Sequence, residues 1–137
     1  MVMLPSGLAN VVADDEDLAR FLTSSRQFNT VMVKPSAFLP SPKDGATSVF
    51  RHGTHPLESL WQLAIQYVLG DRTLHGVAVF KARHVRSASL EVAAQEPPPR
   101  HANIVGWLWS STDPELERAE QKERALLIAQ HAEFIRR

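Results

Sequence analysis

The spacing of apolar residues along the chain predicts three helices. Apolar side chains in residues 18–22 recur at helical spacing directly after Asp14 and Asp15, whose carboxylates can accept hydrogen bonds from the first free amides of a helix. A second helix is predicted over residues 56–70, with proline at its first position and glycine at its end. A third is predicted over residues 112–137, with a polar first half and an apolar second half.

The segments between these helices have strand-like patterns and turn residues at their ends. They are residues 31–33, 47–51, 74–80, 87–93 and 103–109. Strands that follow one another through short turns favour an antiparallel or mixed sheet, so we predict an α+β fold with about five strands and three helices. Residues 1–137 form a single domain in this interpretation, with residues 1–13 as a candidate disordered segment and residues 112–137 as the C-terminal helix.

Composition supports one folded domain. The chain has 137 residues, of which 44% are hydrophobic and 22% charged. It contains no cysteine, which excludes disulfides, thiolate metal sites and a cysteine nucleophile. No apolar run approaches the roughly 20 residues that span a bilayer, and the N-terminus lacks the basic start of a signal peptide. We therefore expect a cytoplasmic protein without a membrane partner.

The charge is balanced overall but unevenly distributed. Residues 14–17 are all acidic, whereas residues 18–109 hold ten lysines and arginines against five acidic residues. This basic middle region could attract a polyanion, or it could be a solvated surface of mixed charge.

Three stretches resemble signature segments of small uncharacterised bacterial proteins. They are VKPSAFLP (residues 33–40), SVFRHG (residues 48–53) and HANIVGW (residues 101–107), about a sixth of the chain. Leu108 stands where the relatives have proline. The resemblance implies a bacterial origin and no particular activity.

The sequence holds two Arg-His pairs: Arg51-His52 lies within SVFRHG, and Arg100-His101 spans the start of HANIVGW. An arginine fork suits phosphate, and a histidine titrates near neutral pH. His52 and His101 are therefore candidate acid–base catalysts, and we predict that both pairs line one concave surface with Lys34 near its edge. Alternatively, the pairs are surface dipeptides that bind nearby loop carbonyls.

Further candidates are aromatic and basic side chains that alternate along predicted strands. Trp107 and Trp109 would share a face, either stacking on a base or packing in the core. Lys81 and Arg83 would share another face if the chain stays extended, as a phosphate-contacting rim or as a protected edge strand.

The pair His52 and His55 has the spacing of metal ligands, but no second close pair accompanies it. The sequence therefore predicts no metal and no cofactor.

Three functions are consistent with these patterns. The first is binding of nucleic acid or a nucleotide through the basic middle region. The second is an enzyme acting on a phosphodiester or nucleotide through His52 and His101. The third is an accessory subunit that docks on a protein partner, or on a second copy, through its C-terminal helix.

Overall fold

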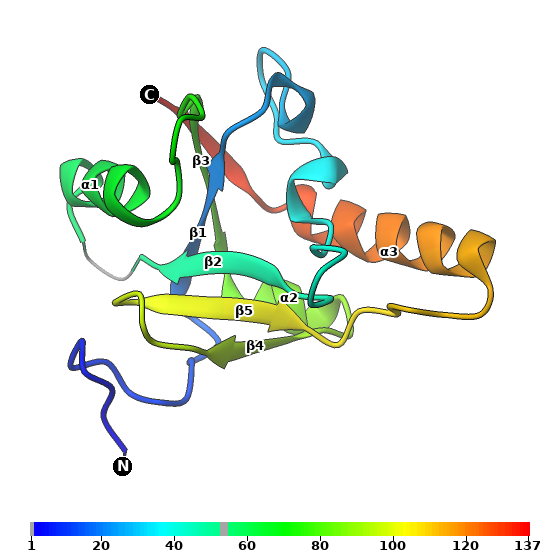
Figure 1. Ribbon diagram of the computed structural model, residues 1–137, viewed down its shortest axis with the longest axis horizontal. Helices are drawn as coiled ribbons and strands as arrows, with labels where there is room; N and C mark the ends of the chain where they lie inside the picture. Colours follow the sequence, from blue (N-terminus) through cyan, green and yellow to red (C-terminus); the bar gives the residue numbers. More distant parts are fainter. Residues whose placement is uncertain (1, 53–54) are drawn as a thin grey trace.

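A six-stranded antiparallel sheet with three α-helices forms the protein, which the computed structural model describes over residues 2–52 and 55–137. The strands are β1 (Asp17–Leu22), β2 (Thr47–Arg51), β3 (Gly76–Lys81), β4 (Glu91–Ala94), β5 (His101–Val105) and β6 (Glu133–Arg136), in the order β4-β5-β2-β1-β3-β6 (Figure 1). The predicted α+β class is confirmed, with one strand more than expected and every pairing antiparallel.

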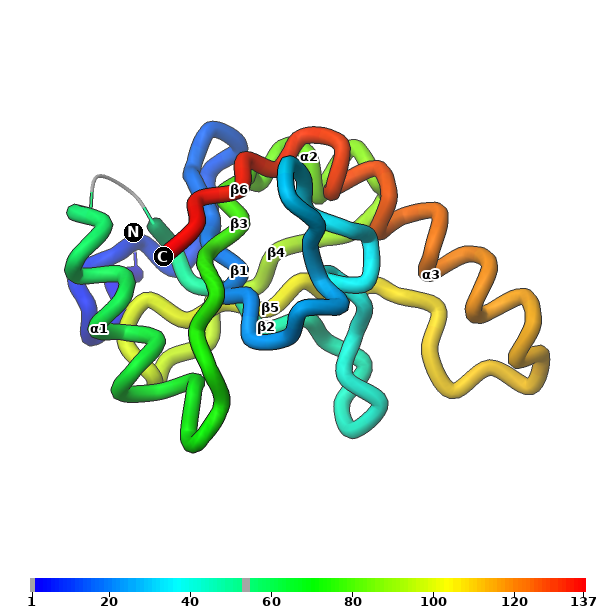
Figure 2. Tube along the Cα trace, turned by 90° about the horizontal axis from the view of Figure 1, so that it is seen from above, coloured from blue at the N-terminus to red at the C-terminus, as the bar shows by residue number. Residues whose placement is uncertain are grey.

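Helices cover both faces of the sheet. Helix α1 (Leu57–Tyr67) packs on one face, and α2 (Ala82–Ser87), α3 (Pro114–Ala129) and the 3₁₀ turn η2 (Pro35–Phe38) pack on the other (Figures 1 and 2). Successive strand residues therefore enter different cores: Leu18 packs with the α3 side and Ala19 with the α1 side. Strands buried on both faces lose the alternation of apolar and polar residues that marks a half-exposed strand.

The helix predicted after Asp14 is wrong for this reason. Residues 17–22 form β1, which lies between β2 and β3 inside the sheet and is buried on both faces. Leu18, Phe21 and Leu22 match helical spacing because four of the six residues of this central strand are apolar and they face both sides of the sheet.

The end of the chain also differs from the prediction. Helix α3 ends at Ala129, and the strand β6 then pairs with β3, so the predicted helix over residues 112–137 is too long. Residues 31–33 do not form a strand: Val33 makes one isolated bridge with Phe28, and Val31 is 81% exposed.

Helix α2 was not predicted, and it overturns the arrangement proposed for residues 80–86. The extended chain ends at Lys81, after which Arg83 points to solvent while Val85 is buried. The expected shared face of Lys81, Arg83 and Val85 does not exist.

The N-terminal segment contacts the end of the sheet near β4 and β5 (Figure 1). The Ser6 hydroxyl donates to Glu96 Oε2 over 2.5 Å, and Val12 is buried in the core on the α3 side. Within the described residues, no helix is long and apolar enough to cross a membrane.

Candidate functional site

Three of the ten lysines and arginines of the basic middle region pair with the acidic run at residues 14–17. Asp14 contacts Arg86, Glu16 contacts Arg51, and Asp17 contacts Lys81, at distances of 2.5, 2.5 and 3.0 Å. Three of the cations that suggested a polyanion-binding surface are therefore neutralised within the chain.

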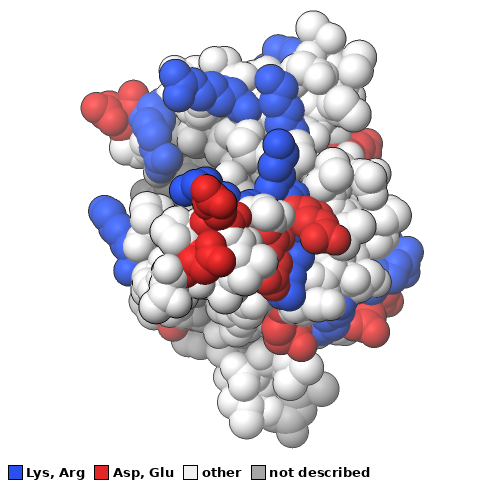
Figure 3. Space-filling model, turned by 90° about the vertical axis from the view of Figure 1, so that its right-hand side faces the viewer, with Lys and Arg blue, Asp and Glu red and all other residues white. Residues whose placement is uncertain are grey.

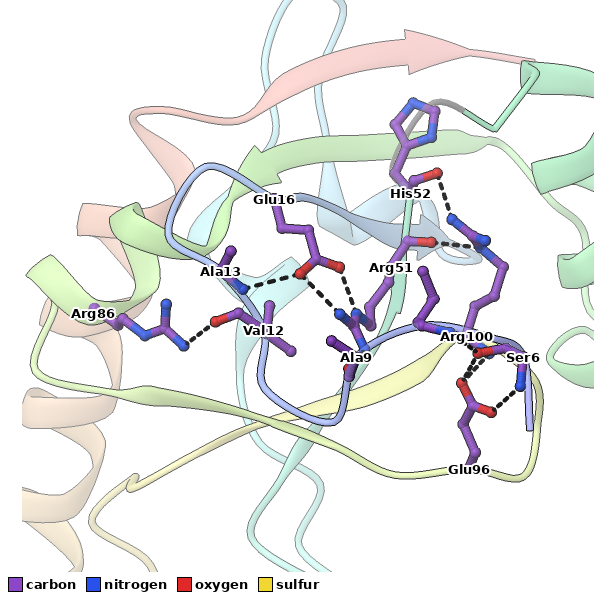
Figure 4. Close-up of polar contacts among 11 residues, drawn as sticks. Ser6, Ala9, Val12, Ala13, Glu16, Arg51, His52, Arg86, Glu96 and Arg100 are labelled. Atoms are coloured by element: carbon purple, nitrogen blue, oxygen red, sulfur yellow. Dashed lines mark hydrogen bonds and ion pairs between the residues drawn. The ribbon is translucent and has the colours of Figure 1, made fainter. Parts of the chain in front are cut away.

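Arg51, a predicted ligand-binding residue, lies in the most buried of these ion pairs (Figure 4). Its side chain is 2% exposed; Nε and Nη2 donate to the two carboxylate oxygens of Glu16 over 2.5 and 2.9 Å, and Nη1 donates to the Ala9 carbonyl over 2.6 Å. Each of the three guanidinium nitrogens thus donates a hydrogen bond within the protein. The side chain holds the N-terminal segment against β2.

Arg100 binds backbone carbonyls at the end of β2. Its Nε donates to the Arg51 carbonyl over 2.8 Å and its Nη2 to the His52 carbonyl over 2.9 Å (Figure 4). The His52 ring points away from this guanidinium. This is the arrangement of the alternative interpretation, in which a charged side chain satisfies loop carbonyls. The next residue, Gly53, lies outside the described residues.

The remaining cations and tryptophans named from the sequence are dispersed. Lys34 lies beside Arg118 and Lys122 around an apolar groove between η2 and α3 of about 390 Å³. Figure 3 views the molecule from the right-hand side of Figure 1, where α3 begins, and shows lysine and arginine side chains gathered above a group of acidic ones. Trp107 is buried in the core, and Trp109 packs on Gly45. The two tryptophans do not share a strand face, because β5 ends at Val105.

His101 is the predicted residue that the structure places in a polar pocket. His101 lies on β5, opposite Phe50 of β2, and faces the α1 side of the sheet. Its ring meets the Phe50 ring edge-on, with the ring centroids 5.3 Å apart. The pocket measures about 310 Å³ and is lined by Arg20, Phe21, Thr23, Ser48, Phe50, Tyr67, Val68, Arg72, Pro98 and His101. We call it the Arg20–Arg72 pocket.

Hydrogen bonds on both ring nitrogens define the state of His101. Nδ1 lies 2.9 Å from the Gln95 carbonyl, which can only accept, so Nδ1 carries the proton. Nε2 lies 2.7 Å from Ser48 Oγ and accepts from the hydroxyl. Burial lowers the pKa of His101, against the smaller opposing effects of the Gln95 carbonyl and Asp44, which favours the neutral ring at pH 7.

Arg20 enters the pocket where the sheet splits. β1 and β2 pair at only two positions and then separate (Figure 1). The Arg20 guanidinium lies between them and donates to the carbonyls of Ala37 and Ser48, each over 2.8 Å. Its pKa is lowered to about 10, chiefly by burial and further by the positive charge of Arg72.

Arg72 lies beyond the C-terminal end of α1. It donates to the carbonyls of Val68 and Leu69 and, over 3.3 Å, to the Thr23 hydroxyl. Among the described residues, neither Arg20 nor Arg72 forms an ion pair with a carboxylate. Two guanidinium groups therefore bring positive charge to one pocket without a protein counter-charge.

Sequence reasoning missed Ser48, Arg20 and Arg72. The signal available was the three stretches marked by resemblance, which meet here: SVFRHG contains Ser48, HANIVGW begins with His101, and VKPSAFLP contains Ala37, whose carbonyl Arg20 binds.

Comparisons with protein-family models, curated proteins and solved structures yield no match to this chain.

Proposed function

We propose that this protein binds a nucleotide, or another small phosphate-bearing ligand, in the Arg20–Arg72 pocket. The observation that carries this proposal is the presence of two guanidinium groups there, without a carboxylate partner among the described residues. A phosphate would supply the missing negative charge. It would accept from Arg20 Nη2 and from the second N–H of Arg72 Nη1 and Nη2, because the bonds within the chain use Nε and Nη1 of Arg20 and one N–H on each Arg72 nitrogen. Arg72 is exposed, whereas the side chain of Arg51 is buried.

The pocket's size and walls favour a nucleotide over a nucleic acid duplex. Its volume of about 310 Å³ is that of a small-molecule site. Tyr67, which is 41% exposed, offers a ring on which a base can stack, and the hydroxyl of Thr23 lies beside the Arg72 donors. The basic middle region also has fewer unpaired cations to contact the phosphate backbone of a nucleic acid, because the acidic run pairs with Arg51, Lys81 and Arg86.

Replacing Arg72 tests this proposal, with ADP as the probe in isothermal titration calorimetry. We expect Arg72→Gln to weaken ADP binding about ten- to a hundredfold, because a hydrogen bond to a charged group contributes about 1.5–3 kcal/mol. Binding to the wild type should weaken as salt is raised.

Arg83→Gln is the matched control, since Arg83 is an exposed arginine of α2 outside the pocket. It should bind ADP as the wild type does, and both variants should melt cooperatively. Equal ADP affinity in the wild type and Arg72→Gln would contradict the proposal.

A second candidate function is docking through α3. Of the five consecutive apolar residues at positions 125–129, Ala125, Ile128 and Ala129 are buried in the core, whereas Leu126 and Leu127 are 45% and 41% exposed. Leu116 of the same helix is 54% exposed. Leu116 and Leu127 line one hollow beside α2, and apolar side chains that adjoin one another on a surface are typical of an interaction site.

We expect this surface to contact a second copy of the chain. Sedimentation velocity over a wide concentration range should then show a concentration-dependent mass, and the double change Leu126→Gln with Leu127→Gln should shift the protein toward monomer. A monomer at every concentration would exclude self-association through α3.

A further inference from the structure

Ser48 and His101 form a hydrogen-bonded pair inside the proposed binding pocket. The two residues lie diagonally across the β2–β5 pairing, because Ser48 is opposite Asn103 and His101 is opposite Phe50. The sheet geometry therefore brings both side chains to the same face, where Ser48 Oγ lies 2.7 Å from Nε2.

Neighbouring groups fix both members of this pair. The Gln95 carbonyl accepts from His101 Nδ1 over 2.9 Å, and Gln95 is itself held by the Asn103 side-chain amide, 2.5 Å from its Oε1. On the other side, the Arg20 guanidinium donates to the Ser48 carbonyl. His101 is thus fixed in the tautomer that accepts the serine proton, while Ser48 is exposed to solvent.

Such an arrangement has the parts of an activated serine. A neutral imidazole that accepts the serine proton can act as its base, and a third group that binds the other ring nitrogen orients it. In this chain a backbone carbonyl takes the place of the orienting carboxylate. The arginines on the same pocket wall supply positive charge where negative charge develops during attack on phosphorus.

We infer that Ser48 is a nucleophile that attacks the phosphorus atom of a phosphate ester held by Arg20 and Arg72, with His101 as the general base. This inference rests on the proposed binding of a phosphate-bearing ligand. It assigns the catalytic role to His101 with Ser48, whereas His52 does not line the pocket.

The reaction balances without a further reagent except water. The bond between Ser48 Oγ and phosphorus forms while the bond from phosphorus to the ester oxygen breaks. The serine proton passes to His101 Nε2 and then to the departing alkoxide, which leaves as an alcohol. Water then attacks the phosphoserine, gives its proton to His101 and releases phosphate, and the proton returns to Ser48 Oγ.

The test uses a fluorophosphonate, whose phosphorus reacts with an activated serine by loss of fluoride. We expect stoichiometric labelling of the wild type, located at Ser48 by peptide mapping and slowed by ADP. Ser48→Ala should not be labelled, and His101→Gln should be labelled about a hundredfold or more slowly, the range of general-base assistance. Ser25→Ala is the control, since Ser25 is exposed on η1 outside the pocket, and it should react as the wild type does.

Two further measurements separate nucleophilic attack from binding and from folding. ADP titration of Ser48→Ala should retain most of the affinity, because the arginines remain. The labelling rate of the wild type should fall as His101 becomes protonated, at a pH below the ordinary value of 6.5. Burial lowers the pKa of this ring against the opposing effects of the Gln95 carbonyl and Asp44.

The possible failures are distinguishable. ADP binding without labelling would overturn the nucleophile and leave the proposed binding function standing. Labelling at Ser48 that ADP does not slow would separate the serine from the phosphate site and overturn the inference as stated. Hydrolysis of p-nitrophenyl acetate through Ser48, with p-nitrophenyl phosphate untouched, would replace phosphorus by an acyl carbon as the centre attacked. Absence of both labelling and ADP binding would overturn both proposals.

Discussion

Replacing Arg51 by alanine is expected to lower the free energy of unfolding by about 3–5 kcal/mol, the cost of breaking a buried ion pair by removing one partner. The guanidinium holds both carboxylate oxygens of Glu16, whose side chain is 18% exposed, and also the Ala9 carbonyl. Without it, a carboxylate is left largely out of water and the N-terminal segment loses its link to β2. Urea denaturation followed by circular dichroism measures this loss.

Lys81→Ala is the matched comparison, because it removes an ion pair from the same acidic run at a more exposed site. The side chains of Lys81 and Asp17 are 34% and 37% exposed, so we expect a loss of about 0–1 kcal/mol. The double change Arg51→Met with Glu16→Met should be less damaging than Arg51→Ala, since it leaves no unpaired charge. Similar losses for Arg51→Ala and Lys81→Ala would show that Arg51 is not part of the structural framework.

Replacing Gly76 by valine is expected to be the second most damaging change, at about 1–3 kcal/mol, because it forces atoms into a filled space. A Cβ at this position would lie 2.5 Å from the Ile135 carbonyl oxygen and 2.8 Å from the Phe134 ring. Since the oxygen belongs to the backbone of β6, this strand must move away from β3. Hydrogen exchange should show faster exchange of the β6 amides.

Gly70→Ala provides the control for this experiment. The position has a positive φ of 57° and no atom within 4 Å of a Cβ, so alanine there strains only the local backbone. It should leave the exchange of β6 unchanged. Unaltered β6 protection in Gly76→Val would mean that β6 accommodates the larger side chain without leaving the sheet.

Local sequence patterns predicted the helices and strands whose apolar and polar positions match their burial in the fold. The helix α1 begins directly after a proline and carries a clear apolar stripe, and β2 has the predicted bounds. The strand predicted over residues 103–109 begins two residues earlier and ends four residues earlier, as β5. β1 was mistaken for a helix because a central strand is apolar on both sides, and no local pattern distinguishes that from a short amphipathic helix. β6 depends on pairing with β3, which the spacing of residues 133–136 does not reveal.

The candidate site was predictable only in part, because its residues are brought together by tertiary structure that local patterns do not reveal. The two Arg-His pairs predicted Arg51 and Arg100 as ligand-binding residues, whereas their guanidinium groups bind Glu16 and backbone carbonyls. Ser48 carries no motif, and its relation to His101 arises from the register of two strands about fifty residues apart. Arg20 reaches the pocket because two adjacent strands separate, a feature of tertiary structure rather than of any local sequence.

The two edge strands of the sheet have features that protect the protein from aggregation. β4 and β6 are each only four residues long, and they carry Glu91 in the first case and Glu133 with Arg136 in the second. Short edges with charged side chains are poor templates for the addition of a further strand from another molecule. Fibril-like growth through the sheet is therefore disfavoured at both ends.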